Sequence, residues 1–189
     1  MLREQGCDVG LKIAGTGPDE EKLQQQIQRL RLQESVTLLG FVQHMAAFYQ
    51  QCDVFVCPSI WESYGLVAVE AFAAGLPVVG ANTDGLPEVV SHGVNGVCVS
   101  PSWDSTAFAT AMNETASFAQ DVSYQAEYDA LVMQKSLSLG DLALAIKSLL
   151  DHPEQYHHMS LAALQAASDI KSYQQLADAV IGSVKEACE

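Results

Sequence analysis

The N-terminal half of the chain alternates short apolar runs with helix-compatible stretches, and this order restricts the fold more than any other feature. The apolar runs are continuous instead of alternating between apolar and polar residues, which is typical of strands covered on both faces. Strands and helices in turn along a chain predict a parallel sheet with crossover helices. We therefore predict an α/β fold, in which a Rossmann-like, doubly wound parallel sheet precedes a helical C-terminal part. Sheets of this type bind ligands at the carboxyl ends of their strands.

Local signals set the expected boundaries of these elements. Strands are predicted at residues 9–14, 36–39, 53–57, 77–81 and 96–99, and helices at 18–32, 44–51, 65–74 and 87–91. Beyond Pro101 the strand signals fade, and helix-compatible stretches cover residues 102–120, 122–135, 141–150 and 172–187, with a further helix that starts near Pro153. We predict a single domain with a core at 1–101, a helical insertion at 102–138 and C-terminal helices at 139–189.

Composition excludes several classes of partner. The chain has 189 residues, of which 49% are hydrophobic, so it is long and apolar enough to bury a core. Its 9 basic and 23 acidic residues give a formal net charge of -14, which repels phosphate backbones and anionic lipid surfaces. Nucleic acid is therefore not expected as a partner. A single phosphate site stays possible, because the amides at a helix N-terminus can bind an anion whatever the net charge.

The cysteines and the first residues favour a cytoplasmic protein. The 5 cysteines contain no CxxC pair and are odd in number, which argues against a disulfide framework and a zinc knuckle. The first residues lack the apolar core of a signal peptide, and no apolar run reaches the roughly 20 residues that a membrane span needs. We expect reduced thiols and a cytoplasmic location.

The segment from Pro58 to Phe72 carries the densest chemical signal, because it joins a predicted strand to a predicted helix where doubly wound sheets bind ligands. Glu70 lies within an apolar helix and is expected to be buried, where an unpaired carboxylate is costly. Either a salt bridge or cap interaction within the protein, or a ligand, must then satisfy it. Glu62 precedes the same helix and is either an exposed loop acid or a second carboxylate of a ligand site.

A ligand with an anionic middle and hydroxyl groups at both ends would suit this segment. Free amides of Gly65, Leu66 and Val67, in the first turn of the helix, would bind a phosphate between the two carboxylates. Each carboxylate would accept hydrogen bonds from one sugar ring. A nucleotide-sugar has this shape.

Several further motifs accompany this segment in a fixed order. They are Ile13–Pro18, Leu39–Val42, Pro58–Gly65, Gly75–Val79, Gly85–Val90 and Asn95–Gly96. Glu62 lies within Pro58–Gly65, and Glu70 follows that segment. Together they resemble the donor-binding half of the retaining GT-B glycosyltransferases of family GT4, continuously over about residues 5 to 101. The resemblance implies an enzyme that transfers a sugar from a nucleotide-diphospho-sugar to an acceptor, with retention of the anomeric configuration. It also implies that no metal and no other cofactor is required.

The resemblance implies a role for each matching residue. Glu70 would accept hydrogen bonds from the ribose hydroxyls, and Glu62, the catalytic carboxylate, would hold and orient the donor sugar. The amides of Gly65, Leu66 and Val67 would take the distal phosphate. The full expected set is Glu62, Ser63, Tyr64, Gly65, Leu66, Val67 and Glu70 for the donor, Gly40, Phe41 and Val42 beside the base, and Gly15 and Gly17 as shapers of the first loop. A tight turn without ligand contact is the alternative for Gly15 and Gly17.

The chain also departs from this family. The strand that precedes the equivalent of Met1 in the family, with its Gly-Arg pair and a later Lys, has no counterpart, and neither has the N-terminal acceptor domain. We therefore expect the chain alone to be inactive, with the missing acceptor domain as its partner. The missing strand is central in the usual order, so we expect a gap in the sheet. Oligomerisation through exposed sheet edges, direct pairing of the flanking strands or marginal stability would follow. Asp84 stands where the family often has Gly, so its carboxylate either points away from a bound diphosphate or weakens donor binding.

Other functions compete with sugar transfer. Gly15-x-Gly17 after a strand suggests dinucleotide binding, but Glu20 stands where the third glycine of GxGxxG belongs, which disfavours hydride transfer. A sugar-nucleotide epimerase or phosphorylase of the same architecture fits the intact pair of carboxylates less well than a transferase does. The alternative of a different class is a non-catalytic module that binds nucleotide-sugars or a partner protein, which the missing cations and the negative charge favour.

Overall fold

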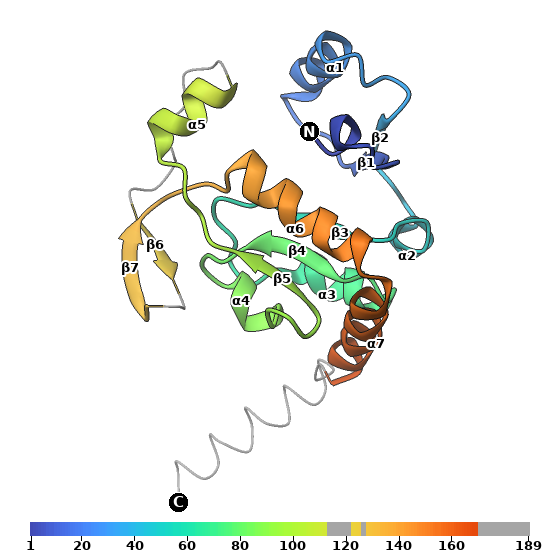
Figure 1. The fold of residues 1–189 in the computed structure, drawn as a ribbon, viewed down its shortest axis with the longest axis vertical. Helices are drawn as coiled ribbons and strands as arrows, with labels where there is room; N and C mark the ends of the chain where they lie inside the picture. The colour runs from blue at the N-terminus through green and yellow to red at the C-terminus, as the bar shows by residue number, and fades with distance from the viewer. Residues whose placement is uncertain (113–121, 126–127, 170–189) are drawn as a thin grey trace, which may run out of the picture.

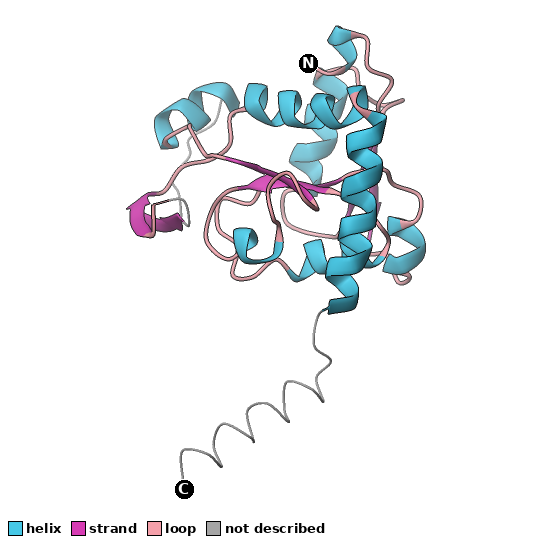
Figure 2. Ribbon diagram, turned by 60° about the horizontal axis from the view of Figure 1, so that its bottom comes forward, coloured by secondary structure: helices cyan, strands magenta, loops and turns pink. Residues whose placement is uncertain are grey.

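The computed structural model describes residues 1–112, 122–125 and 128–169 (Figure 1). Its centre is a parallel sheet in the order β3-β4-β5, formed by Phe55–Cys57, Val78–Ala81 and Gly96–Val99. The helices around it are α3 (Leu66–Ala73), α4 (Leu86–Val89), α6 (Leu139–Asp151) and α7 (Pro153–Asp169). Figure 2 shows the strands between these helices. The predicted fold class, a doubly wound α/β sheet, is confirmed.

The core has one layer on each face of β4, because successive strand residues point to opposite faces. Val78 belongs to a buried cluster with side chains of α3, α4 and α7, and Val79 belongs to a second cluster with side chains of α6 and α7. Both valines are fully buried. The unbroken apolar run at 77–81 predicted this burial on two faces.

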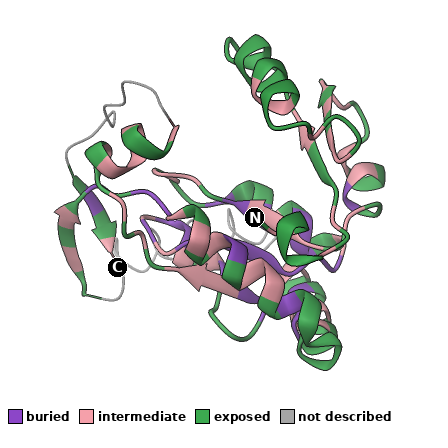
Figure 3. Cartoon of the chain, turned by 45° about the horizontal axis from the view of Figure 1, so that its top comes forward, coloured by how far each residue is buried: buried purple, intermediate pink, exposed green. Residues whose placement is uncertain are grey.

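The first part of the chain forms a smaller unit, here called the N-terminal module, which spans residues 1–43. It contains a short 3₁₀ helix (Arg3–Gln5), β1 (Leu11–Ala14), α1 (Glu20–Arg29) and β2 (Val36–Gly40). β1 and β2 pair in parallel. None of the residues 1–48 is buried. In Figure 3 the module is green and pink, and the purple, buried residues lie in the rest of the chain. Tyr49, the last residue of α2 (Met45–Tyr49), is the first buried residue of the chain.

The predicted gap in the sheet is confirmed. In the usual order, 3-2-1-4-5-6, the first strand separates the second strand from the fourth. Over the described residues, β1 and β2 form one sheet, β3, β4 and β5 form another, and no ladder joins β1 to β3. Direct pairing of the flanking strands, one of the expected ways to close the gap, therefore does not occur. Each sheet has an open edge where a central strand would lie.

The prediction of a helical insertion at 102–138 is wrong in its second part. α5 (Ser105–Met112) is a helix as predicted, and residues 113–121 lie outside the described part of the chain. β6 (Val122–Gln125) and β7 (Ala130–Met133), however, pair as the antiparallel strands of a hairpin. Asp129, with a φ of 48°, occupies the left-handed region in the turn. That backbone conformation ends any helix there and reverses the chain.

The predicted C-terminal helices are confirmed as far as the structure describes them. Ser138 caps α6, since its Oγ accepts a hydrogen bond of 3.0 Å from the amide of Asp141. Pro153 begins α7, where the missing amide hydrogen of proline costs nothing. The helix predicted at 172–187 lies outside the described residues. Among those that are described, no helix has the length and apolar character needed to cross a membrane.

Candidate functional site

The loop between β3 and α3 is held in one conformation by two glycines. Gly65 caps α3 in the left-handed region with a φ of 88°, and a Cβ there would lie 2.8 Å from Leu86 Cδ1. The amide of Gly85 donates a hydrogen bond of 2.9 Å to the carbonyl oxygen of Glu62. A Cβ on Gly85 would collide with the carbonyl oxygen of Ser63. The loops that follow β3 and β4 therefore pack backbone to backbone at the carboxyl end of the sheet.

Glu62 points at the N-terminus of α3. Its Oε1 accepts a hydrogen bond of 3.1 Å from the amide of Gly65, and its Oε2 accepts one of 3.4 Å from the hydroxyl of Ser59. The carboxylate thus accepts the hydrogen bond of one of the amides expected to bind a phosphate. Among the described residues, the amides of Leu66 and Val67 donate to no protein acceptor. An anion at this helix end would find two open amides and a third that only Glu62 contacts.

Glu70 is exposed, so the prediction that it is buried is wrong. α3 buries one face, which includes Ala68 and Phe72, and exposes the face that carries Leu66, Val67 and Glu70. Among the described residues, no hydrogen bond joins this exposed face to the N-terminal module, and the sheet is open between β1 and β3. A salt bridge or backbone cap, one of the alternatives for Glu70, is also absent among the described residues. The partner of Glu70 is the hydroxyl of Tyr49, at 3.1 Å from Oε2.

Sequence reasoning missed Tyr49 as a site residue. It lies 21 positions before Glu70, at the end of the short helix α2, and only the fold brings the two together. A buried tyrosine hydroxyl needs a hydrogen-bond partner, and a tyrosine in an otherwise apolar helix was the signal that could have found it.

The residues predicted beside the base and in the first loop lie in the N-terminal module. Gly15 follows β1 with a φ of 133°, and its amide donates a hydrogen bond of 2.7 Å to the carbonyl oxygen of Gly40, which has a φ of 61°. Phe41, beside Gly40, is 81% exposed. The structure therefore brings the loops after β1 and β2 together. No hydrogen bond between described residues joins them to the loop of Glu62 or to α3.

Asp84 points away from the α3 N-terminus and toward the hairpin. Its Oδ1 accepts a hydrogen bond of 2.9 Å from the amide of Tyr124, and its own amide donates one of 2.8 Å to the carbonyl oxygen of Tyr124. The structure thus shows the first of the two expected alternatives, a carboxylate that points away from the site of a diphosphate. Its φ of 48° explains why a glycine suits the same position.

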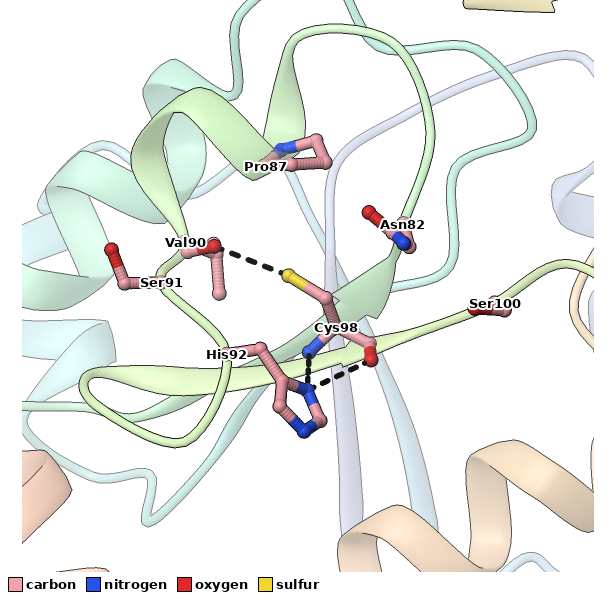
Figure 4. Close-up of a pocket in the computed structure, with 7 residues that line it drawn as sticks. All are labelled: Asn82, Pro87, Val90, Ser91, His92, Cys98 and Ser100. Carbon is pink, nitrogen blue, oxygen red and sulfur yellow. Dashed lines mark hydrogen bonds between the residues drawn. The ribbon is translucent and has the colours of Figure 1, made fainter. Parts of the chain in front are cut away.

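A shallow pocket of about 370 Å³ lies beside β5 and α4, and Figure 4 shows its lining. The lining residues are Asn82, Pro87, Val90, Ser91, His92, Cys98 and Ser100, none of which belongs to the predicted donor site. The amide of Cys98 lies 3.2 Å from Nδ1 of His92, and its thiol donates to the carbonyl oxygen of Val90. Burial raises the pKa of the Cys98 thiol to about 11, so the thiol stays protonated and is a poor nucleophile at neutral pH. The pocket therefore offers no catalytic group comparable to the loop of Glu62.

The α3 N-terminus brings open amides and the two carboxylates of the sequence analysis together. Glu62 lies before the open amides of Leu66 and Val67, and Glu70 lies one helical turn beyond them. Anion-binding amides between two hydroxyl-binding carboxylates can hold a molecule with a phosphate in its middle and hydroxyls on either side.

Comparison with known proteins shows the family to which the chain belongs. The model of the family glycosyl transferases group 1 matches residues 1–127. An uncharacterized glycosyltransferase of Methanocaldococcus jannaschii is 42% identical over 93 residues, which cover 48% of this chain and 24% of that protein. The glycogen synthase of Mycobacterium tuberculosis is 37% identical over 102 residues, which cover 53% of this chain and 25% of that protein.

Solved structures show the same fold. Anabaena HepE in complex with UDP-glucose matches with a TM-score of 0.66 and 26% identity, over 92% of this chain and 41% of that one. The chain spans about a quarter of the length of the two curated relatives and 41% of HepE. The family model covers both predicted carboxylates and the whole parallel sheet. The chain belongs to the glycosyl transferases group 1 family.

Proposed function

We propose that this chain is the donor-binding half of a retaining GT4 glycosyltransferase, which transfers a sugar from a nucleotide-diphospho-sugar to an acceptor. The observation that carries the proposal is the α3 N-terminus, with open amides at Leu66 and Val67 between the carboxylates of Glu62 and Glu70. The related HepE has been solved with UDP and with UDP-glucose, which supports a uridine nucleotide as the first candidate.

Each group has a distinct part in the proposed complex. The amides of Leu66 and Val67, with the helix dipole, take the distal phosphate and stabilise the charge that grows on it as the sugar leaves. When the phosphate binds, it also accepts the hydrogen bond of the Gly65 amide and replaces Glu62 as its acceptor. The Glu62 carboxylate then accepts hydrogen bonds from the donor sugar. Glu70 accepts hydrogen bonds from the ribose hydroxyls. The helix end, not a metal ion, is the electrophilic group in this proposal.

The activity of the whole protein remains part of the proposal, because the chain spans only a fraction of its relatives. The acceptor would bind in a second domain, across the carboxyl ends of the strands. Gly40, Phe41 and Val42 would flank the base only if the N-terminal module approaches α3 when donor binds, since no hydrogen bond joins the two in the described residues.

A non-catalytic nucleotide-sugar-binding module is the second candidate, and one observation favours it. The sequence between Arg31 and Lys135 contains no lysine or arginine, so none from this segment can neutralise a diphosphate. Donor binding without transfer, measured after the chain is combined with an acceptor domain, would separate this candidate from the first.

Isothermal titration calorimetry with UDP-glucose, UDP, GDP and ADP tests the proposal. We expect saturable binding of one nucleotide, and Glu70→Ala should weaken it roughly tenfold or more, because hydrogen bonds to a carboxylate are each worth about 1.5–3 kcal/mol. Glu154→Ala is the matched control, since Glu154 is an exposed glutamate in the first turn of α7. Binding unaffected by Glu70→Ala, or weakened equally by both variants, would contradict the proposed site.

A further inference from the structure

Tyr49 is the only described residue that holds the Glu70 carboxylate. Its hydroxyl lies 3.1 Å from Oε2 of Glu70 and 3.5 Å from the carbonyl oxygen of Val67. Tyr49 is 3% exposed, whereas Glu70 is exposed. A buried, rigid donor therefore contacts a carboxylate that is otherwise free to move in solvent.

The ring of Tyr49 is fixed by the core. It packs edge-on against Phe55 with ring centroids 5.8 Å apart, and it belongs to the buried cluster that contains Phe72 and Val78. Its position is thus set by β3, α3 and β4 together. A hydroxyl on such a ring has a fixed place relative to α3.

The hydroxyl donates to Glu70 in preference to Val67. A phenol has one proton to donate, the carboxylate oxygen is the nearer of the two acceptors, and hydrogen bonds to a charged acceptor are the stronger. Burial, followed by the hydrogen bond to Glu70, raises the pKa of Tyr49 well above its usual value. The hydroxyl consequently remains a donor over the whole physiological pH range.

A glutamate on an exposed helix face samples several rotamers, and fixing one of them costs conformational free energy. Tyr49 holds Oε2 in advance and leaves Oε1 open to a ligand. A carboxylate with one oxygen held and the other open is arranged to accept hydrogen bonds from neighbouring hydroxyls of one ring. Preorganisation of this kind increases affinity because the ordering cost is met before binding.

We propose that Tyr49 is a positioning residue, which holds the Glu70 carboxylate in the orientation that accepts the 2′- and 3′-hydroxyls of a nucleotide ribose. This inference rests on the proposed function, because it assigns the ribose to Glu70. It adds a residue from outside the loop of Glu62 and α3, and it makes α2 part of the site.

The test compares two ligands with and without the hydroxyls in question. We expect Tyr49→Phe to weaken the binding of UDP roughly five- to tenfold, because part of the cost of ordering Glu70 then falls on ligand binding, and to change the binding of 2′,3′-dideoxy-UDP less than about twofold. Tyr156→Phe is the control, because it removes a part-buried hydroxyl that donates to the carbonyl oxygen of Asp53 and not to Glu70. It should leave both affinities unchanged.

A double-mutant cycle separates positioning from folding. Tyr49→Phe added to Glu70→Ala should cause no further loss of UDP affinity, because a residue that acts through Glu70 has nothing left to position. Equal losses for UDP and the dideoxy analogue, or additive losses in the double variant, would overturn the inference and indicate a purely structural role. An effect of Glu70→Ala without an effect of Tyr49→Phe would overturn the inference and leave the proposed function intact. Equal affinity of the unaltered chain for UDP and the dideoxy analogue would overturn the inference about Tyr49 and the assignment of the ribose to Glu70 in the proposed function.

Discussion

The sequence predicted where Glu62 and Glu70 lie along the chain, but not which groups they contact. Their positions around a helix N-terminus followed from the sequence, because glycine at position 65 and the apolar run after it define where α3 begins. The partners of the two carboxylates did not follow. The Gly65 amide that contacts Glu62 and the Tyr49 hydroxyl that contacts Glu70 depend on loop geometry and on long-range packing. Local sequence carries little information about either.

Gly65 is the residue whose substitution should disturb this geometry most directly. We expect Gly65→Ala to lower the free energy of unfolding by about 1–2 kcal/mol, because a φ of 88° is costly for any residue with a Cβ and the new atom would crowd Leu86. Chemical denaturation followed by circular dichroism measures the change.

Gly140→Ala provides the contrasting variant for that experiment. Gly140 lies in the first turn of α6, has no positive φ, and has only Ser138 Oγ, at 3.9 Å, near an added Cβ. Alanine there should raise the stability by roughly 0.5–1 kcal/mol, as in other helix positions. If both variants behaved alike, the left-handed conformation at Gly65 would not be a source of strain.

Among the elements, the strands of the central sheet were the most predictable and the hairpin was the least. β4 and β5 occupy the predicted ranges to within one residue, because continuous apolar runs between glycine and proline leave few alternatives. In the hairpin, Tyr124, Tyr128 and Leu131 recur at helical spacing, while Val122 and Tyr124 alternate with polar residues as in a strand. Both periods fit this sequence. The docking of Tyr124 on Asp84, which the sequence does not show, favours the strand.

The hairpin binds the core through its polar face. Gln125 and Gln134 donate to the carbonyl oxygens of Asn82 and Ile60, and Ser123 is buried. The opposite face is apolar and exposed, with Val122, Tyr124, Leu131 and Met133 as its members. Hydrogen bonds to two loops at the carboxyl end of the sheet therefore help to attach this element.

Removal of the Asp84 carboxylate should release the hairpin locally. In Asp84→Gly, which keeps the left-handed backbone accessible, we expect the Tyr124 amide to exchange its hydrogen about tenfold faster, since its acceptor is lost. Asp84→Asn keeps an acceptor oxygen and should preserve the protection of that amide. The Val79 amide in β4 should be unaffected in both variants. Equal protection of Tyr124 in the glycine and asparagine variants would mean that Asp84 does not anchor the hairpin.

At the scale of the whole molecule, charge and sheet topology set the conditions for function. Acidic residues exceed basic ones by 14, and the basic residues are confined to the two ends of the sequence. The segment that forms α3 and its flanking loops therefore supplies helix amides, but no lysine or arginine, to a diphosphate. The sheet is also open between β1 and β3. A central strand from elsewhere would close the gap and could bring cations with it.

The open sheet also predicts unequal stability within the molecule. The N-terminal module has no buried side chain, whereas β4 is buried along its whole length. We expect the amides of β1, such as that of Ile13, to exchange hydrogen through local opening at a free energy a few kcal/mol below that of the Val79 amide in β4. Native-state hydrogen exchange followed by NMR measures both.

The N-terminal module could be protected from early hydrogen exchange either by dimer formation or by unfolding only together with the rest of the chain. Measurements at several protein concentrations distinguish these two cases. If two copies paired through the open edges of β1 or β3, protection of Ile13 would rise with concentration and sedimentation would show a dimer. A monomer in which Ile13 and Val79 exchange only by global unfolding would contradict the prediction, because it would require the module to share a cooperative core that the described residues do not contain. Early exchange of Ile13 in a monomer would instead show that the gap between the sheets divides the chain energetically as well as topologically.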